Sequence, residues 1–135
     1  MFAFSRPVRF EEIDAARIVF FARYLNMCHD AMEAFFGALP GGYAGLIVGR
    51  GIGFPAVRAE CDYKSSLRYG DVVRVEVTVP HVGKTSVTFE YRLVRENDEV
   101  EVGRAKQTCV VCDLDTMKKT PIPDDVRALL VAHAT

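Results

Sequence analysis

The chain has 135 residues, of which half are apolar and 26% are charged, and its formal net charge at pH 7 is −1. This length corresponds to a single domain over residues 1–135, with enough apolar side chains to form a packed core. The balanced charge argues against a module that binds nucleic acid or anionic membranes, because such modules carry a broad basic surface.

No apolar run reaches the ~20 residues that a membrane-spanning helix needs. The first residues also do not follow the basic-then-apolar order of a secretory signal. The four cysteines lie within apolar patterns and not at the spacings of a disulfide framework. We therefore expect a cytoplasmic protein whose thiols are reduced.

The N-terminal part of the chain predicts a strand followed by a long helix. Residues 2–10 have the pattern of a short strand, with Pro7 suited to the edge of a sheet. In residues 22–36, apolar side chains recur at steps of three and four, which is the period of an amphipathic helix. Gly37 is typical of the position just past a helix, and the glycine-rich segment 37–54 predicts a loop.

Four later segments alternate apolar and polar residues, as strands with one buried face do. These segments are residues 56–64, 71–79, 86–93 and 104–111. The tail 117–133 predicts a short amphipathic helix. A one-sided sheet must cover its apolar face, and residues 22–36 form the only long amphipathic helix available to do so. We therefore predict an α+β fold in which a five-stranded antiparallel sheet wraps around a long central helix.

The segment between the first strand and the helix carries the candidate catalytic residue. Asp14 precedes a mostly apolar run, so its carboxylate is expected beside a hydrophobic surface. The helix that begins near Ala22 presents free backbone N–H groups, and no Ser, Thr, Asp or Asn directly precedes it as a cap. Such a pair suits acyl transfer, since the carboxylate attacks or activates water and the amides hold the oxyanion. The pattern alone fits a turn aspartate at the surface equally well.

The run from Asp14 to Tyr24, DAARIVFFARY, resembles the signature of the 4-hydroxybenzoyl-CoA thioesterase family, which includes acyl-CoA thioesterases associated with the Tol-Pal system. The similarity covers nearly the whole chain, including Phe54-Pro55, the turns at 69–71 and 83–86, and residues 121–123. The resemblance implies a hotdog fold and hydrolysis of an acyl-CoA thioester to free acid and CoA. It implies no cofactor, because CoA is part of the substrate.

Residue by residue, the resemblance assigns the site to the start of the helix. It implies that Asp14 is the catalytic nucleophile or general base, that the backbone N–H of Phe21 belongs to the oxyanion hole, and that Tyr24 is the aromatic residue of the first turn. Arg17 stands where the family usually has glycine, which puts the local backbone conformation in question. The guanidinium of Arg17 could instead place a cation near the thioester or a phosphate of CoA.

Basic residues outside this segment are candidates for the phosphates of CoA. The resemblance implies contacts from Lys84 and from the amides around Gly83, although a solvated lysine at a turn explains Lys84 as well. Other cations that nothing in the sequence ranks are Arg50, Arg58 and Arg68.

Two cysteine patterns do not support a site. Cys28 and His29 are adjacent in the predicted helix and point ~100° apart, so they cannot pair. Cys109 and Cys112 lie three apart in a predicted strand and face opposite sides, so no metal site is expected.

Four phenylalanines are more typical of a core than of an acyl pocket, although part of this group could line one. They are Phe20, Phe21, Phe35 and Phe36.

Two other functions remain open from the sequence. A non-catalytic acyl-CoA sensor would share the fold, and Asp14 favours an enzyme over it. A hydratase or dehydratase usually needs a histidine or a glutamate, and residues 14–24 contain no histidine.

Open sheet edges favour a homodimer paired edge to edge. The resemblance implies an active site at that interface, and a homotetramer as a further step.

Overall fold

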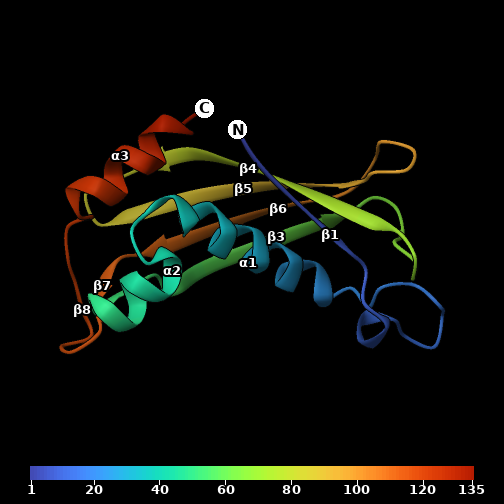
Figure 1. The fold of residues 1–135 in the computed structure, drawn as a ribbon, viewed down its shortest axis with the longest axis horizontal. Helices are drawn as coiled ribbons and strands as arrows, with labels where there is room; N and C mark the ends of the chain where they lie inside the picture. Colours follow the sequence, from blue (N-terminus) through green and yellow to red (C-terminus); the bar gives the residue numbers. More distant parts are fainter.

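Five antiparallel strands form one sheet in the order β1-β4-β5-β6-β3, and the long helix α1 crosses one face of it (Figure 1). The computed structural model describes all residues from Met1 to Thr135. The strands of this sheet are β1 (Phe2–Pro7), β3 (Ala56–Tyr63), β4 (Val72–Val82), β5 (Ser86–Arg95) and β6 (Val100–Val110). The other elements are α1 (Arg23–Phe35), α2 (Gly42–Ala44), β2 (Ile52–Gly53), β7 (Cys112–Asp113), β8 (Lys118–Lys119) and α3 (Asp124–Ala132).

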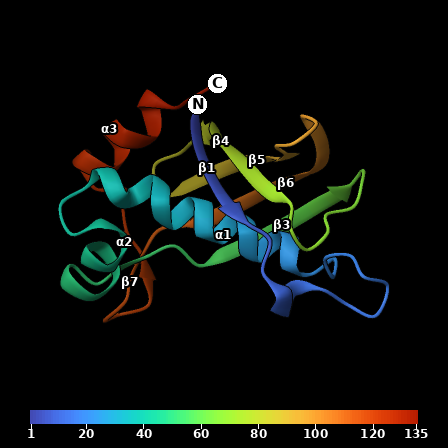
Figure 2. The ribbon, with the colours of Figure 1, turned by 45° about the vertical axis from the view of Figure 1, so that its right-hand side comes forward.

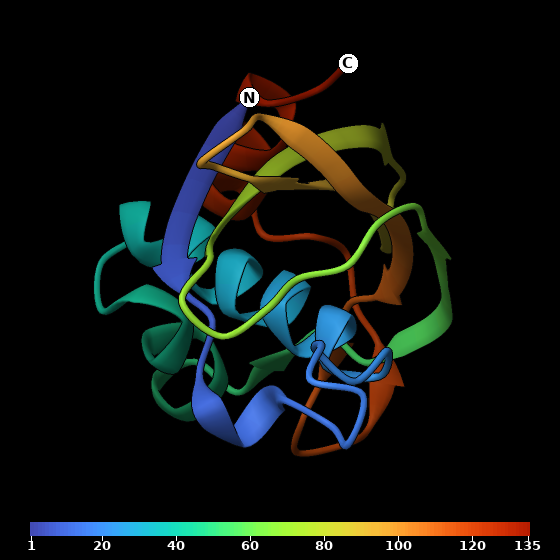
Figure 3. The same cartoon turned by 90° about the vertical axis from the view of Figure 1, so that its right-hand side faces the viewer.

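The sheet curves around α1, which lies in its concave side (Figure 3). Both termini lie beside β4, because β1 pairs with its Val72–Val77 half and Ala134 bridges to Val79 (Figure 2). No single helix is long and apolar enough to cross a membrane, and α1 reaches such a length only together with the turns after it, at a bend of 80°. The prediction of a hotdog arrangement is therefore confirmed, with the strand order now defined.

The core forms between α1 and the concave face of the sheet. The buried residues of α1 recur every three or four positions and meet buried side chains that alternate along β4 and β5. They are Tyr24, Met27, Cys28, Ala31, Met32 and Phe35. Leu25 belongs to the apolar residues that recur along the predicted helix, but it is 39% exposed. Burial of side chains such as Phe35, Phe89 and Leu93 contributes roughly 1.5–3 kcal/mol each to folding.

The glycine-rich segment 37–54 is more ordered than the predicted loop. It forms α2 and a π-helical turn at Gly45–Gly49, and then the short strand β2. Gly41 and Gly42 have φ of 77° and 62°, which glycine adopts without a Cβ penalty. The glycines therefore allow tight consecutive turns that periodicity alone does not reveal.

Strand β3 is an open edge of the sheet. Its side chains are exposed on both faces, including Val57 at 64% and Tyr63 at 45%. The other edge, β1, contains the predicted edge proline, Pro7. In this single chain Val57 has no covering element, whereas Tyr63 packs against Tyr24 at the start of α1.

Candidate active site

Asp14 lies in a narrow hairpin that precedes α1. Ile13 bridges to Val19, the Asp14 amide donates to the Ile18 carbonyl at 2.9 Å, and the Arg17 amide donates to the Asp14 carbonyl at 3.0 Å. One carboxylate oxygen of Asp14 accepts a 2.8 Å hydrogen bond from the Ala16 amide. The second oxygen has no protein partner, and the residue is half-buried. The carboxylate is thus oriented through one oxygen and free at the other.

The backbone at Arg17 is left-handed. Its φ is 68°, a conformation that glycine adopts freely and that costs other L-residues roughly 1–2 kcal/mol. Arg17 is the position at which the resembled family usually has glycine. The hairpin therefore keeps the glycine-type turn in spite of the arginine.

A buried ion pair holds the base of this hairpin. Arg6 on β1 and Glu12 are 6% and 4% exposed, and Arg6 Nη1 donates to Glu12 Oε1 at 2.9 Å. Asp30 on α1 lies 3.0 Å from Arg6 Nε. Burial tends to raise the pKa of Glu12, but the hydrogen bonds from Arg6 and from the Arg9 amide outweigh it and lower that pKa. The pair therefore ties β1, the hairpin and α1 together.

The start of α1 presents two free amides. Arg23 donates to the Phe20 carbonyl at 2.9 Å and Tyr24 to the Phe21 carbonyl at 3.3 Å, whereas the amides of Phe21 and Ala22 donate to no protein acceptor. No side chain caps the helix at Ala22, as predicted. Two adjacent N–H groups at the positive end of a helix can hold a developing oxyanion.

Two tyrosines fix the geometry beside these amides. Tyr63 on β3 donates its hydroxyl to the Phe21 carbonyl at 2.9 Å, and Tyr24 donates to the Ser65 carbonyl at 3.1 Å. The two rings meet edge to face with centroids 5.0 Å apart. Burial and the neighbouring Cys61 raise the pKa of Tyr63 to about 12, so its hydroxyl remains a donor.

An open cavity of about 280 Å³ lies next to the free amides. Its lining residues are Ile18, Val19, Phe21, Tyr24, Tyr63, Lys64, Ser65 and Ser66. A more enclosed cavity of about 160 Å³ lies further along α1, between the helix and the sheet. It is lined by Leu25, Cys28, Ala59, Tyr91, Ala105 and Gln107. Both cavities are concave sites of the kind that small-molecule ligands occupy.

The four phenylalanines fall into two groups. Phe35 and Phe36 are buried in the core, at 1% and 0% exposure. Phe20 and Phe21 are 45% and 61% exposed at the start of the helix, and only Phe21 lines a cavity. The enclosed cavity contains none of them.

The structure does not bring Lys84 and Gly83 to Asp14 within one chain. The Asp14 hairpin follows β1 near Val72, at the start of the 11-residue strand β4, whereas Gly83 follows the end of that strand. Eleven residues of strand span roughly 35 Å, and Figure 1 shows the two regions at opposite ends of the sheet. The Gly83 amide is also occupied, because it donates to the Ser86 carbonyl at 2.7 Å. The expectation that this amide is available for a phosphate is therefore wrong.

Arg17 and Arg68 are two cations near the Asp14 hairpin. Both line an open hollow of about 470 Å³ beside the hairpin, and neither side chain forms an ion pair with an acidic residue. Phe10 and Tyr69 line the same hollow, with ring centroids 5.6 Å apart. Arg50 is paired with Asp125 at 2.8 Å and Arg58 lies near Glu60 at 3.5 Å.

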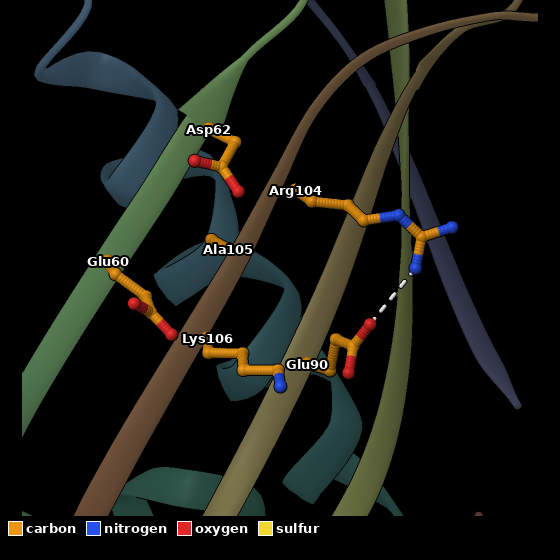
Figure 4. Close-up of a pocket in the computed structure, with 6 residues that line it drawn as sticks. All are labelled: Glu60, Asp62, Glu90, Arg104, Ala105 and Lys106. Atoms are coloured by element: carbon orange, nitrogen blue, oxygen red, sulfur yellow. Dashed lines mark hydrogen bonds and ion pairs between the residues drawn. The ribbon is translucent and has the colours of Figure 1, made fainter.

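A further hollow, of about 180 Å³, lies on the outer face of the sheet (Figure 4). It is lined by Glu60, Asp62, Glu90, Arg104, Ala105 and Lys106. Arg104 and Glu90 are paired across it at 2.9 Å, and α1 lies behind the strands in this view. This charged hollow contains none of the predicted site residues.

Some site residues were not singled out by sequence reasoning. Tyr63 belongs to the predicted apolar face of its strand, but its bond to Phe21 joins residues 42 positions apart. Gln107 had a visible signal, since it is a polar residue on an otherwise apolar strand face. His29 is exposed with its Nε2 atom 3.4 Å from a Glu33 carboxylate oxygen, whereas Cys28 is buried, so these neighbours face apart as predicted.

Comparison with known proteins shows the family of the chain. Residues 8–130 match the thioesterase-like superfamily. The chain is 31% identical over 124 residues to a 1,4-dihydroxy-2-naphthoyl-CoA hydrolase of Synechococcus elongatus, covering 91% of this chain and 90% of that protein. It is 31% identical over 127 residues to the acyl-CoA thioesterase YbgC of Haemophilus influenzae, covering 93% and 92%.

A solved structure shows the same fold. A thioesterase-superfamily protein from Jannaschia sp. is 27% identical and superposes with a TM-score of 0.91, over 99% of this chain and 93% of the other. The chain therefore belongs to the thioesterase-like superfamily, and it is a hotdog-fold acyl-CoA thioesterase.

Proposed function

We propose that this thioesterase hydrolyses its acyl-CoA substrate with Asp14 as nucleophile or general base and the amides of Phe21 and Ala22 as oxyanion hole. One observation carries the proposal. Backbone hydrogen bonds join Asp14 to Ile18, in the segment that leads into α1. That helix begins with two backbone amides that have no acceptor, beside an open cavity. A carboxylate and an oxyanion site are the two parts that acyl transfer needs.

In this reaction the substrate carbonyl oxygen lies at the two amides. Asp14 attacks the carbonyl carbon, or removes a proton from a water that attacks it, through the carboxylate oxygen that has no protein partner. Negative charge then develops on the carbonyl oxygen, where the N–H groups and the helix dipole stabilise it. The carbon–sulfur bond then breaks, and CoA leaves as its thiolate, which takes up a proton. In the nucleophile route water hydrolyses the resulting anhydride between Asp14 and the acyl group and so restores the carboxylate. In the general-base route the attacking water has already supplied the oxygen of the free acid. Tyr24, in the first turn, lines the cavity that holds the thioester.

We further propose that the active unit is a homodimer in which two β3 strands pair antiparallel. The exposed apolar side chains of β3 support this pairing, because sheet edges of this kind are usually covered. The C-terminal end of β3 lies near the Asp14 hairpin, where Tyr63 reaches Phe21. The N-terminal end of β3 lies at the other end of the sheet, with Gly83 and Lys84 (Figure 1).

A two-fold axis through β3 would therefore bring the Lys84 hairpin of one protomer towards the Asp14 hairpin of the other. Lys84 is exposed and forms no ion pair, so it is available for a phosphate of CoA in that assembly. Arg17 and Arg68 are the alternative cations within the same chain.

A homotetramer would be a further association of such dimers. Because all four cysteines are free, the chain also suits the reducing cytoplasm.

The proposal is tested with a panel of aromatic and aliphatic acyl-CoA thioesters and a dye that detects the released thiol. The parent protein is expected to release CoA from at least one of them. Asp14→Ala is expected to abolish the release, since the variant lacks the proposed catalytic carboxylate. Release of CoA at the parent rate by Asp14→Ala would rule out the mechanism.

A further inference from the structure

Three hollows are joined by shared lining residues, and the first of them lies beside the free amides. The cavity at those amides shares Ser65 and Ser66 with a polar hollow of about 370 Å³. That polar hollow shares Arg68 with the open hollow of about 470 Å³ that Arg17 also lines. Ser65 and Arg68 are three residues apart, which is at most ~10 Å of backbone. The hollows therefore form one connected row that starts at the free amides.

The middle hollow of this row presents polar groups that no protein atom uses. The Ser66 carbonyl accepts a hydrogen bond from Arg95 Nη1 at 2.6 Å, but the amide and the hydroxyl of Ser66 form none. The side-chain amide of Asn97 in the same hollow is also without a protein partner. The pantetheine arm of CoA contains two amide groups and a hydroxyl, which need donors and acceptors of this kind. The middle hollow therefore suits that arm.

The far hollow of the row carries two arginines without acidic partners. Arg17 and Arg68 are exposed and neither forms an ion pair, whereas Arg92 and Arg104 on the outer face of the sheet are both paired. The one carboxylate of the row, Asp71, lines the middle hollow and accepts the Arg68 amide at 2.8 Å. The far hollow thus contains no negative charge. Arginine binds phosphate through two parallel hydrogen bonds, so this end favours a phosphate ligand.

The backbone at Arg17 agrees with a functional role for its side chain. Its φ of 68° is a conformation that glycine adopts freely and that strains other residues. Strained residues that the surrounding structure holds in place are concentrated at ligand sites. Here the strained position is also one of the two that carry the unpaired charge of the far hollow.

Two exposed aromatic rings line the same far hollow. Phe10 is 75% exposed and Tyr69 is 64% exposed, and their planes meet at 73° with centroids 5.6 Å apart. Nucleic-acid bases stack on aromatic faces that are open in this way. The far hollow therefore combines a surface for a base with two cations for phosphate, which is the chemistry of a nucleotide.

We infer that the nucleotide of CoA binds in the far hollow, with its 3′-phosphate held by Arg17 and Arg68 and its adenine stacked on the two aromatic rings. The pantetheine arm then passes Ser66 and reaches the free amides. The inference rests on the proposed function, because it takes the thioester carbonyl to lie at those amides. It assigns the nucleotide to the same chain as the thioester, in preference to Lys84 of a second copy.

The test measures the Kd of CoA, of 3′-dephospho-CoA and of pantetheine on the parent protein by titration calorimetry. CoA is expected to bind about tenfold or more tightly than dephospho-CoA, because the latter lacks the phosphate that pairs with the arginines. Pantetheine is expected to bind more weakly than dephospho-CoA, since it also lacks the base. All three are free thiols, so these measurements need no turnover.

Three variants assign the contacts. Arg17→Gln and Arg68→Gln are each expected to bring the Kd of CoA close to that of dephospho-CoA, which itself changes by less than about twofold. Tyr69→Leu is expected to weaken CoA and dephospho-CoA alike, by about fivefold or more, and to leave pantetheine unchanged. Arg9→Gln is the matched control, because Arg9 is an exposed arginine that lines none of the three hollows. It should leave all three constants unchanged.

Equal affinity of the parent protein for CoA and dephospho-CoA would overturn the inference. So would a preference for CoA that survives both arginine variants, that Arg9→Gln reduces as much, or that Lys84→Gln abolishes. Each of these results leaves hydrolysis itself in place. If instead the preference depends on Arg17 and Arg68 but no acyl-CoA thioester releases CoA, the nucleotide site stands and the proposed function fails.

Discussion

The hydroxyl of Tyr63 donates a hydrogen bond of 2.9 Å to the carbonyl oxygen of Phe21. The Phe21 carbonyl and the Ala22 N–H belong to one planar peptide unit, so the bond also fixes the direction of that amide. Strand β3 thereby holds the proposed oxyanion hole at the correct angle. Catalysis by fixed dipoles depends on such preorganisation.

Tyr63→Phe removes this bond and retains the ring. We expect kcat to fall by about ten- to a hundredfold, with little change in KM, because the amide is mispositioned mainly for the transition state. Steady-state kinetics on the best substrate of the panel measure both constants. Tyr43→Phe is the control, since the Tyr43 hydroxyl makes no hydrogen bond and its ring stacks on Phe36, after the last residue of α1. A rise in KM with kcat unchanged would show that Tyr63 only binds substrate.

The turn at Arg17 stores conformational strain. The residue at position 17 has a φ of 68°, which carries a steric cost for alanine and none for glycine. The Arg17→Gly variant is therefore expected to be more stable than Arg17→Ala by about 1 kcal/mol. Chemical denaturation of the two variants measures this difference. If Arg17 also binds a phosphate of CoA, both variants raise KM although one gains stability. Equal stability of the two variants would mean that the turn is not left-handed in solution.

The Arg6–Glu12 pair stabilises the base of the hairpin. Glu12→Gln leaves the buried Arg6 guanidinium with Asp30 as its only counter-charge, and we expect a loss of about 1.5–3 kcal/mol in the free energy of unfolding. Glu11→Gln, the exposed neighbour, is the control and is expected to change stability by less than about 0.5 kcal/mol.

The pair also predicts a pH dependence. The pKa of Glu12 is lower in the folded protein than in the unfolded chain, so its contribution is complete at neutral pH. It is lost as pH falls below the unfolded value of about 4.3 and through the folded value. The stability difference between the parent protein and Glu12→Gln should therefore shrink in acid. A difference that is constant from pH 7 to pH 3 would contradict the pairing.

The fold was largely predictable because local periodicity reports which faces are buried. The alternation in residues 71–79 and 86–93 predicted β4 and β5, and the helical period predicted α1 within one residue at each end. Strand order could not be predicted, since it depends on contacts between distant segments. The turns within residues 37–54 were missed because glycine permits several conformations.

The parts of the proposed site were predictable where they are local in sequence. The uncapped start of α1 follows from the residues before Ala22, and Asp14 stands eight residues before it in the chain. The Tyr63 bond to Phe21 and the Tyr91 bond to Gln107 cross between elements, and no periodicity encodes them. Lys84, the predicted contact of a CoA phosphate, lies at the other end of β4 from the Asp14 hairpin within one chain, and its role stays a prediction.

The proposed dimer makes a prediction about the edge strand. Val57→Asp places a charge on an exposed side chain of β3, which the single chain tolerates and a β3–β3 interface does not. Light scattering of the parent protein should give at least twice the chain mass of 15.0 kDa, and the variant should shift towards the single chain and lose activity. Lys118→Gln on β8 should change neither property. A parent protein that sediments only as a 15.0 kDa species would refute the dimer.

The most direct test of the mechanism is the turnover rate of Asp14→Asn. Asparagine keeps the oxygen that accepts the Ala16 amide, so the hairpin is retained while the negative charge is lost. We expect kcat to fall by about a thousandfold or more, with substrate affinity within about threefold of the parent. A variant that hydrolyses acyl-CoA at the parental rate would contradict the assignment of Asp14 as the catalytic carboxylate.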